Sequence, residues 1–124
     1  MGLRIATAQF EHKSGDKASN LSVIDGLAGK AAAQGARAVA FHECSITGYS
    51  FARRLSREQM LELAEYIPGG ESINALQRIA EKHDITVLAG LFEKDREDKL
   101  YKAYVCVDKN GLVAKYRKLH PFIN

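Results

Sequence analysis

The sequence predicts an α/β fold built around a mixed β-sheet with helices on at least one face. Short apolar runs typical of buried strands alternate with segments of helical periodicity. A strand–helix–strand order implies a right-handed crossover and a parallel pair of strands. Two later strands are joined through Asn110-Gly111, a dipeptide that favours a tight antiparallel hairpin. The 124 residues suffice for one domain, or part of one, with a genuine core.

The first β–α–β unit is expected before residue 43. Apolar and β-branched residues predict a strand from Leu3 to Phe10. Asp16 can cap the helix that follows, and Gly35 is a natural helix stop. The next strand, Ala38–His42, is too apolar and too short for an exposed edge. The inward helix face is predicted from apolar residues at three- and four-residue steps: Leu21, Ile24, Leu27, Ala28 and Ala31.

The middle of the chain predicts a loop and two further helices. Residues 44–55 are expected to form the loop. Ser56 and Gln59 then fit a capping box, which begins a helix that should run to about Tyr66. A second helix is predicted over Ser72–His83, with apolar residues at helical spacing.

Three strands are expected to complete the sheet. They are Ile85–Phe92, which ends at Glu93, and the hairpin strands Leu100–Val107 and Leu112–Lys118. An α/β domain usually continues after such a hairpin with another helix or strand. The sequence therefore predicts that residues 1–124 form a single incomplete domain.

Composition excludes several functional classes. Hydrophobic residues make up 46% and charged residues 27% of the chain, as in ordinary globular proteins. No apolar run approaches the ~18–20 residues of a membrane span, and no secretory leader precedes the first strand, so a cytoplasmic location is expected. Cys44 and Cys106 lack the spacing of a disulfide framework or a zinc site, and no two histidines have metal-ligand spacing.

The net charge of +3 is mild, and basic residues gather in two groups without aromatic interleaving: Lys109, Lys115, Arg117, Lys118; and Arg53, Arg54, Arg57. Solvated loop and strand faces explain this pattern better than a nucleic-acid patch. We therefore expect no nucleic-acid partner and no membrane partner.

Glu43 is the first candidate catalytic residue. Alternation from Val39 and Phe41 would place its carboxylate on an apolar face, at the carboxyl end of a parallel strand, where α/β sheets place their sites. Partial desolvation there would raise its pKa toward a value useful to a general base. The alternative is an acid that caps amides of the following loop.

Lys118 is the second candidate. Alternation through Leu112, Ala114 and Tyr116 puts it on an apolar face, with Lys115 and Arg117 pointing the other way. An inward lysine requires an anionic partner or a function. The alternative is a side chain whose ammonium group reaches water at the sheet edge.

Three other residues are weaker candidates. Glu93 closes an apolar strand as Glu43 does and could join the same cluster, although its position favours structural pairing with an arginine or a lysine. Cys44 is better explained as a small buried residue than as a nucleophile, because neighbours in an extended segment point to opposite faces. The same explanation applies to Cys106.

Taken together, the motifs resemble those of the nitrilase, or carbon–nitrogen hydrolase, superfamily. Phe41-His42-Glu43 with Thr47-Gly48-Tyr49 resembles its catalytic-glutamate motif, and Tyr116-Arg117-Lys118-Leu119-His120 resembles its catalytic-lysine motif. The opening Ile5–Phe10 and the segment Gly90–Glu93 fit as well. The sequence departs at His42, where the family commonly has proline, and at Lys102, where it commonly has asparagine; both bear on substrate class.

The resemblance implies an α-β-β-α sandwich and a Glu–Lys–Cys constellation that hydrolyses non-peptide C–N bonds without metal or cofactor. Glu43 would be the general base and Lys118 the stabiliser of the oxyanion. Tyr49, Glu93 and His120 are the expected substrate-binding residues. The substrate would be a small amide, carbamoyl compound or nitrile, and a homo-oligomer is expected.

The family's nucleophilic cysteine lies in a later segment, and neither cysteine of this chain matches its motif. The resemblance therefore implies that the chain supplies only the glutamate and the lysine and is inactive alone. The alternative is a non-catalytic half-domain that binds a small acid or a protein partner.

Overall fold

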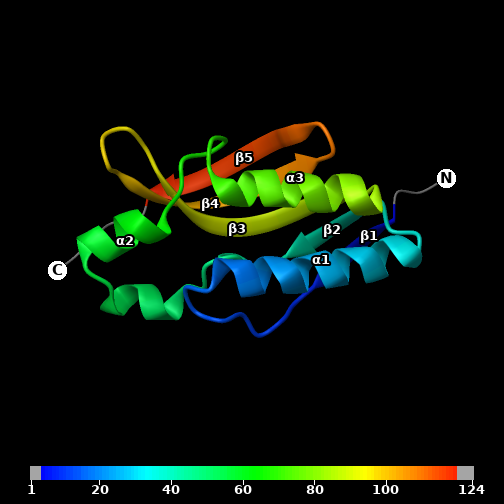
Figure 1. Cartoon of the computed structure of the whole chain (residues 1–124), viewed down its shortest axis with the longest axis horizontal. Helices are drawn as coiled ribbons and strands as arrows, with labels where there is room; N and C mark the ends of the chain where they lie inside the picture. The colour runs from blue at the N-terminus through cyan, green and yellow to red at the C-terminus, as the bar shows by residue number, and fades with distance from the viewer. Residues whose placement is uncertain (1–3, 120–124) are drawn as a thin grey trace.

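A five-stranded mixed sheet forms the centre of the computed structural model, which describes residues 4–119 (Figure 1). Its strands follow chain order: β1 (Ile5–Ala8), β2 (Ala38–Phe41), β3 (Thr86–Lys94), β4 (Leu100–Asp108) and β5 (Gly111–Leu119). β1, β2 and β3 run parallel, whereas β4 and β5 continue the sheet antiparallel. The predicted mixed α/β sheet is confirmed.

Two long helices, α1 (Lys17–Ala33) and α3 (Glu71–His83), lie side by side on one face of the sheet (Figure 1). Alternate strand residues meet the apolar stripes of these helices, so this face contains the main core. The opposite face is uncovered at the edge strands, where Ile5 is 57% and Tyr116 is 72% exposed, whereas the segment 44–64 covers Phe92 of β3. The chain therefore forms one helix layer and one sheet layer of the predicted sandwich.

Local capping chemistry begins the helices where the sequence predicts. The Asp16 side chain accepts a hydrogen bond from the Ser19 amide at the start of α1. Ser56 and Gln59 form the expected capping box at the start of α2 (Arg57–Leu63). Gly111 adopts the positive φ of 117° that the hairpin requires.

Two expectations for the middle of the chain are wrong. The segment 44–55 is not all loop, because Ser50–Arg54 form a 3₁₀ turn. The helix α2 ends at Leu63 rather than near Tyr66. Its next residues are extended because Glu65 bridges to β3: its amide donates to the Phe92 carbonyl, and its carbonyl accepts from the Lys94 amide.

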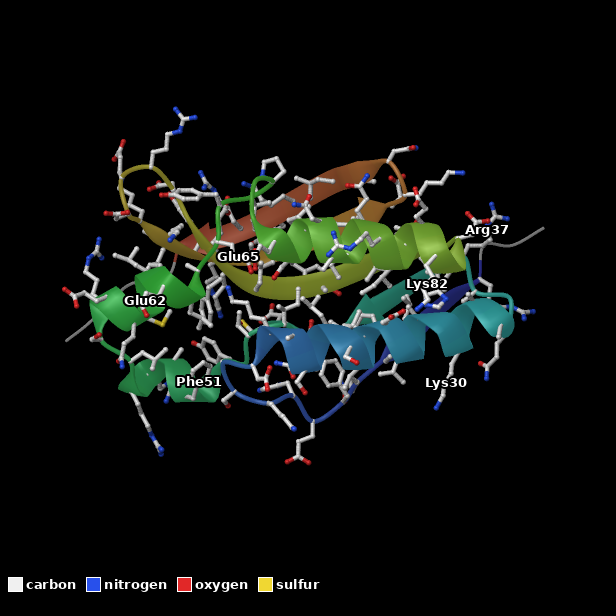
Figure 2. All side chains as sticks on the ribbon, viewed as in Figure 1. Lys30, Arg37, Phe51, Glu62, Glu65 and Lys82 are labelled. Atoms are coloured by element: carbon white, nitrogen blue, oxygen red, sulfur yellow. The ribbon has the colours of Figure 1, made fainter. Side chains whose placement is uncertain are left out.

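The buried carboxylate of Glu65 joins three segments. It accepts a hydrogen bond from the Ser72 amide at 2.8 Å and another from the Ser72 hydroxyl, and it pairs with the Lys17 ammonium at 3.0 Å. Lys17 begins α1 and Ser72 lies in the first turn of α3, so one side chain fixes both helix starts against the end of α2. Figure 2 labels Glu65 between α2 and α3. A carboxylate at a helix N-terminus also complements the helix dipole.

Replacing Glu65 by alanine is expected to lower the free energy of unfolding by about 3 kcal/mol. The substitution leaves the partly buried Lys17 ammonium and the buried Ser72 amide without their partner. Urea unfolding followed by circular dichroism measures the change. Glu62→Ala is the matched control: Glu62 is an exposed residue of α2 (Figure 2), and its loss should shift stability by less than about 0.5 kcal/mol. Equal effects of the two substitutions would refute this role of Glu65.

Candidate active site

Glu43 follows β2 on a turn rather than on the strand. Pairing of β2 with its neighbour ends at Phe41, and residues 43–47 form a turn that the Gly48 amide closes on the Cys44 carbonyl at 2.7 Å. The strand alternation that predicted Glu43 on the apolar face of Val39 and Phe41 therefore stops before it. Glu43 is exposed, so the expected burial of its carboxylate is wrong for this chain.

The turn that carries Glu43 is seated on β3 at Gly90. The Ile46 amide donates to the Gly90 carbonyl at 3.0 Å, and the Gly90 amide donates to the Ser45 hydroxyl at 3.2 Å. A Cβ atom at Gly90 would lie 2.4 Å from the Cys44 amide nitrogen. Gly90 is therefore a positioning residue. Its signal in the sequence, a glycine inside an apolar strand, indicates a close backbone approach.

A β-bulge decides which way the end of β5 faces. Val107 pairs with Leu112, but the preceding Cys106 pairs with Ala114, so Val113 has no partner on β4. Two residues of β5 thus oppose one residue of β4, which reverses the alternation of side chains at that point. The unbroken alternation predicted from Leu112 to Lys118 therefore does not hold along this strand.

The bulge places Lys118 on the uncovered face of the sheet. Leu112 packs with the helix-side core, whereas Lys118 lies beyond the bulge on the opposite face; the expected shared apolar face is therefore wrong. Lys115 and Arg117 point toward the helix layer, where they meet Glu93.

Glu43 and Lys118 nevertheless line one cavity. It has a volume of about 90 Å³ and is bounded by Glu43, Cys44, Lys102, Ala103, Tyr104, Tyr116 and Lys118. The Tyr104 hydroxyl donates to the Phe41 carbonyl at 2.6 Å, which ties β4 to the end of β2 beneath the cavity. Burial raises the pKa of Tyr104, and the negative charges of Cys106 and Glu43 act in the same direction. Tyr104 thus stays a neutral donor.

The structure does not bring the predicted substrate-binding residues Tyr49 and Glu93 together. Tyr49 stacks on Phe92 and lies under the Lys102 ammonium, 4.6 Å from the ring centroid, beside the cavity. Glu93 is buried on the helix side and pairs with Lys115 at 2.5 Å and with Arg117 at 3.7 Å. The structure does not bring Glu93 to the cavity, because it shares a sheet face with Leu91; structural pairing is the arrangement found. His120 lies outside the described residues.

Neither cysteine is an activated thiol. Burial raises the pKa of Cys44 to about 11; the Lys102 ammonium opposes this shift and the Glu43 carboxylate adds to it. Burial also raises the pKa of Cys106, with a further contribution from Asp108. A nucleophilic cysteine requires a lowered pKa. Cys44 therefore lines the cavity as a small buried side chain, although it stands next to Glu43.

A histidine pair adjoins the turn. His12 Nδ1 lies 3.2 Å from His42 Nε2, and the two rings stack with centroids 5.4 Å apart. Burial lowers the pKa of His42, and the charge of His12 lowers it further. His42 directly precedes Glu43, so protonation of His42 changes the charge next to the turn that carries the Glu43 carboxylate.

Folding stability should therefore depend on His42 in mildly acidic solution. The unfolded chain takes up a proton at His42 near its ordinary pKa of 6.5, whereas the folded chain resists protonation. The unfolded state then holds more protons below about pH 6.5, so the free energy of unfolding should fall as pH falls through this value. Thermal melts at pH 7.5 and pH 5.5 should show a smaller loss for His42→Asn than for the wild type. The same loss in both proteins would exclude His42 as the cause.

Three further residues line the cavity. The sequence marked Lys102 only as a departure from the family and Tyr116 only as part of a motif, and Tyr104 was not a candidate. Lys102 and Tyr104 flank the core residue Ala103 on β4, and Tyr116 lies between Lys115 and Arg117 on β5. Their position beside Lys118 follows from cross-strand register, which the sequence does not display. Within residues 4–119, no group of three or more His, Cys, Asp or Glu side chains could hold a metal ion. Within the same range, no helix has the length and apolarity to cross a membrane.

The fold of this chain resembles that of solved amidase structures. The chain superposes on an N-terminal amidase with a TM-score of 0.78 and 24% identity, covering 97% of this chain and 28% of that one. It superposes on an amidase from Nesterenkonia sp. with a TM-score of 0.73 and 23% identity, covering 98% of this chain and 44% of that one. These likenesses show that the sheet and its helices follow the fold of these amidases.

Sequence comparison identifies the family. A nitrilase of Pyrococcus abyssi is 35% identical over 97% of this chain and 44% of its own length. The omega-amidase NIT2 of Homo sapiens is 32% identical over 96% of this chain and 41% of its own length. The chain thus spans less than half of these relatives. Residues 4–123 match the family described as carbon-nitrogen hydrolase, and the chain therefore belongs to the carbon–nitrogen hydrolase family.

Proposed function

We propose that this chain supplies the general base and the oxyanion-stabilising cation of a hydrolase that cleaves the C–N bond of small amides. The single observation that carries the proposal is that Glu43, on the turn after β2, and Lys118, on the edge strand β5, line the same cavity. An acid and an ammonium group brought together from distant segments can divide the work of acyl transfer between them.

In the proposed reaction a cysteine from outside residues 1–124 is the nucleophile. Glu43 accepts the thiol proton, and the thiolate attacks the amide carbonyl carbon. The oxyanion that forms is stabilised by the Lys118 ammonium. The tetrahedral intermediate collapses to a thioester as the C–N bond breaks, and the leaving nitrogen takes up the proton as ammonia or an amine. Water activated by Glu43 then hydrolyses the thioester to the acid and the free thiol.

The raised pKa values of Cys44 and Cys106 support a nucleophile from elsewhere. The uncovered face of the sheet supports a further layer of protein over the cavity, which would remove Glu43 from water. In this proposal residues 1–124 are one incomplete domain and are inactive alone. Cytoplasmic location and self-association remain predictions of the same proposal.

Ammonia release tests the proposal. The complete polypeptide, meaning the product of the whole reading frame that encodes these residues, is assayed beside residues 1–124 with butyramide and propionitrile. We expect ammonia from the complete polypeptide and none from residues 1–124. Equal rates from both proteins would overturn the missing-nucleophile argument. Binding of a small acid without hydrolysis would favour the non-catalytic alternative instead.

A further inference from the structure

The cavity holds more positive than negative charge. Lys102 and Lys118 are direct cross-strand partners of β4 and β5, and both line the cavity. Side chains in such pairs start about 5 Å apart, and like charges placed there destabilise a sheet. Among the residues described, Glu43 is the one carboxylate that lines the cavity. Two ammonium groups against one carboxylate leave an excess of one positive charge.

The other face of the same two strands shows how this sheet balances such a pair. There, Lys115 and Arg117 both reach the buried carboxylate of Glu93. Lys102 has a different environment: its ammonium lies 4.6 Å from the centroid of the Tyr49 ring, and Tyr49 is itself stacked on Phe92. A cation–π contact positions an ammonium group without neutralising it. Lys102 is therefore held in place with its charge available to an anion.

The two lysines cannot do the same work in the proposed reaction. Lys118 stabilises the oxyanion at the carbonyl carbon, and Glu43 handles the proton. The ammonium of Lys102 projects from the neighbouring strand, about 4.8 Å away, and lies toward Tyr49. A molecule that meets both ammonium groups must carry a second negative or strongly polar oxygen a few bonds from its amide.

From this arrangement we propose that Lys102 is a specificity residue, which binds a carboxylate of the substrate, so that the preferred substrate is a short amido acid rather than a neutral amide. The proposal rests on the proposed amide hydrolysis and narrows it. The substrate carboxylate would restore charge balance in the cavity, and a charge-assisted hydrogen bond from Lys102 would fix the distance of the amide from Lys118.

The test compares succinamate with butyramide, which differ by a carboxylate in place of a methyl group. In the complete polypeptide we expect kcat/KM to favour succinamate. Lys102→Met keeps the length of the side chain without its charge, and should lower the succinamate-to-butyramide ratio about 10- to 100-fold, mainly through the KM for succinamate. Lys102→Arg should restore most of the ratio. Lys109→Met, at an exposed residue of the hairpin tip, should keep the wild-type ratio.

The outcomes separate the two proposals. A Lys102→Met protein with unchanged selectivity, or with equal losses for both substrates, would show that Lys102 is only structural. If the wild type hydrolyses neither substrate, the proposed function fails. Calorimetric titration with succinate then decides the role of Lys102: binding that Lys102→Met abolishes supports an anion site, and equal or absent binding in both proteins overturns it.

Discussion

Replacing Glu43 by glutamine is expected to lower kcat/KM for amide hydrolysis by the complete polypeptide about a thousandfold. Glutamine keeps the size of the side chain but cannot accept the thiol proton, and loss of a general base costs about 10²- to 10⁴-fold. Because Glu43 is exposed in residues 4–119, the same substitution made in residues 1–124 should leave the melting temperature of that protein unchanged. Steady-state ammonia release and a thermal melt measure the two quantities. Glu62→Gln, an exposed change on α2, is the control and should keep full activity.

Lys118→Met belongs to the same experiment. Removing one oxyanion stabiliser costs about 10²- to 10³-fold in kcat. If Glu43 and Lys118 serve one chemical step, the double variant should lose far less than the product of the two single losses, as residues that act as a unit do. More than a tenth of wild-type activity in Glu43→Gln, or single losses that simply multiply, would contradict the joint site.

Gly90→Ala is expected to damage both activity and stability. The added methyl group would lie 2.4 Å from the Cys44 amide nitrogen and within 3.2 Å of the Glu43 backbone, which cannot move aside as a flexible side chain can. The turn must lift from β3, which weakens the hydrogen bonds of Ile46 and Ser45 to Gly90. We expect a loss of about 2 kcal/mol in the free energy of unfolding and about a hundredfold in kcat/KM.

Gly26→Ala is the matched control for the same chemical change. Gly26 lies within α1, and a Cβ atom there would meet nothing within 4 Å. Alanine should therefore stabilise the helix by about 0.5–1 kcal/mol and leave activity unchanged. The opposite signs at the two glycines distinguish a blocked backbone approach from a general effect of alanine. A Gly90→Ala protein as stable and active as the wild type would show that the turn is not seated as described.

Local chemistry explains why much of the fold could be predicted. The Asp16 cap, the capping box of Ser56 and the hairpin at Gly111 depend on near neighbours in sequence, so short patterns identify them. The parallel start of the sheet follows from element order and the handedness of crossovers. The end of α2 could not be predicted this way, because Glu65 leaves the helix to pair with the distant strand β3.

The sequence predicted which residues form the candidate site, but it did not predict which face of the sheet their side chains occupy. Motif resemblance singled out Glu43 and Lys118, and they line one cavity, but alternation placed both on the wrong face. The bulge at Val113 and the turn after Phe41 interrupt the alternation of side chains between the two faces of the sheet. Neither feature can be predicted from the residue types around it. The sequence marks Lys102 only as a departure from the family pattern, because its place beside Lys118 comes from register across two strands.

Mapping the acyl-enzyme by mass spectrometry tests most directly whether Glu43 and Lys118 serve a sulfur atom from another segment. The complete polypeptide is mixed with succinamate, quenched in acid within the steady state, digested and searched for the acyl mass. We predict the adduct on a cysteine beyond Asn124, and its disappearance in Glu43→Gln. An adduct on Cys44 or Cys106 would contradict the assignment of the nucleophile and, with it, the division of labour proposed for this cavity.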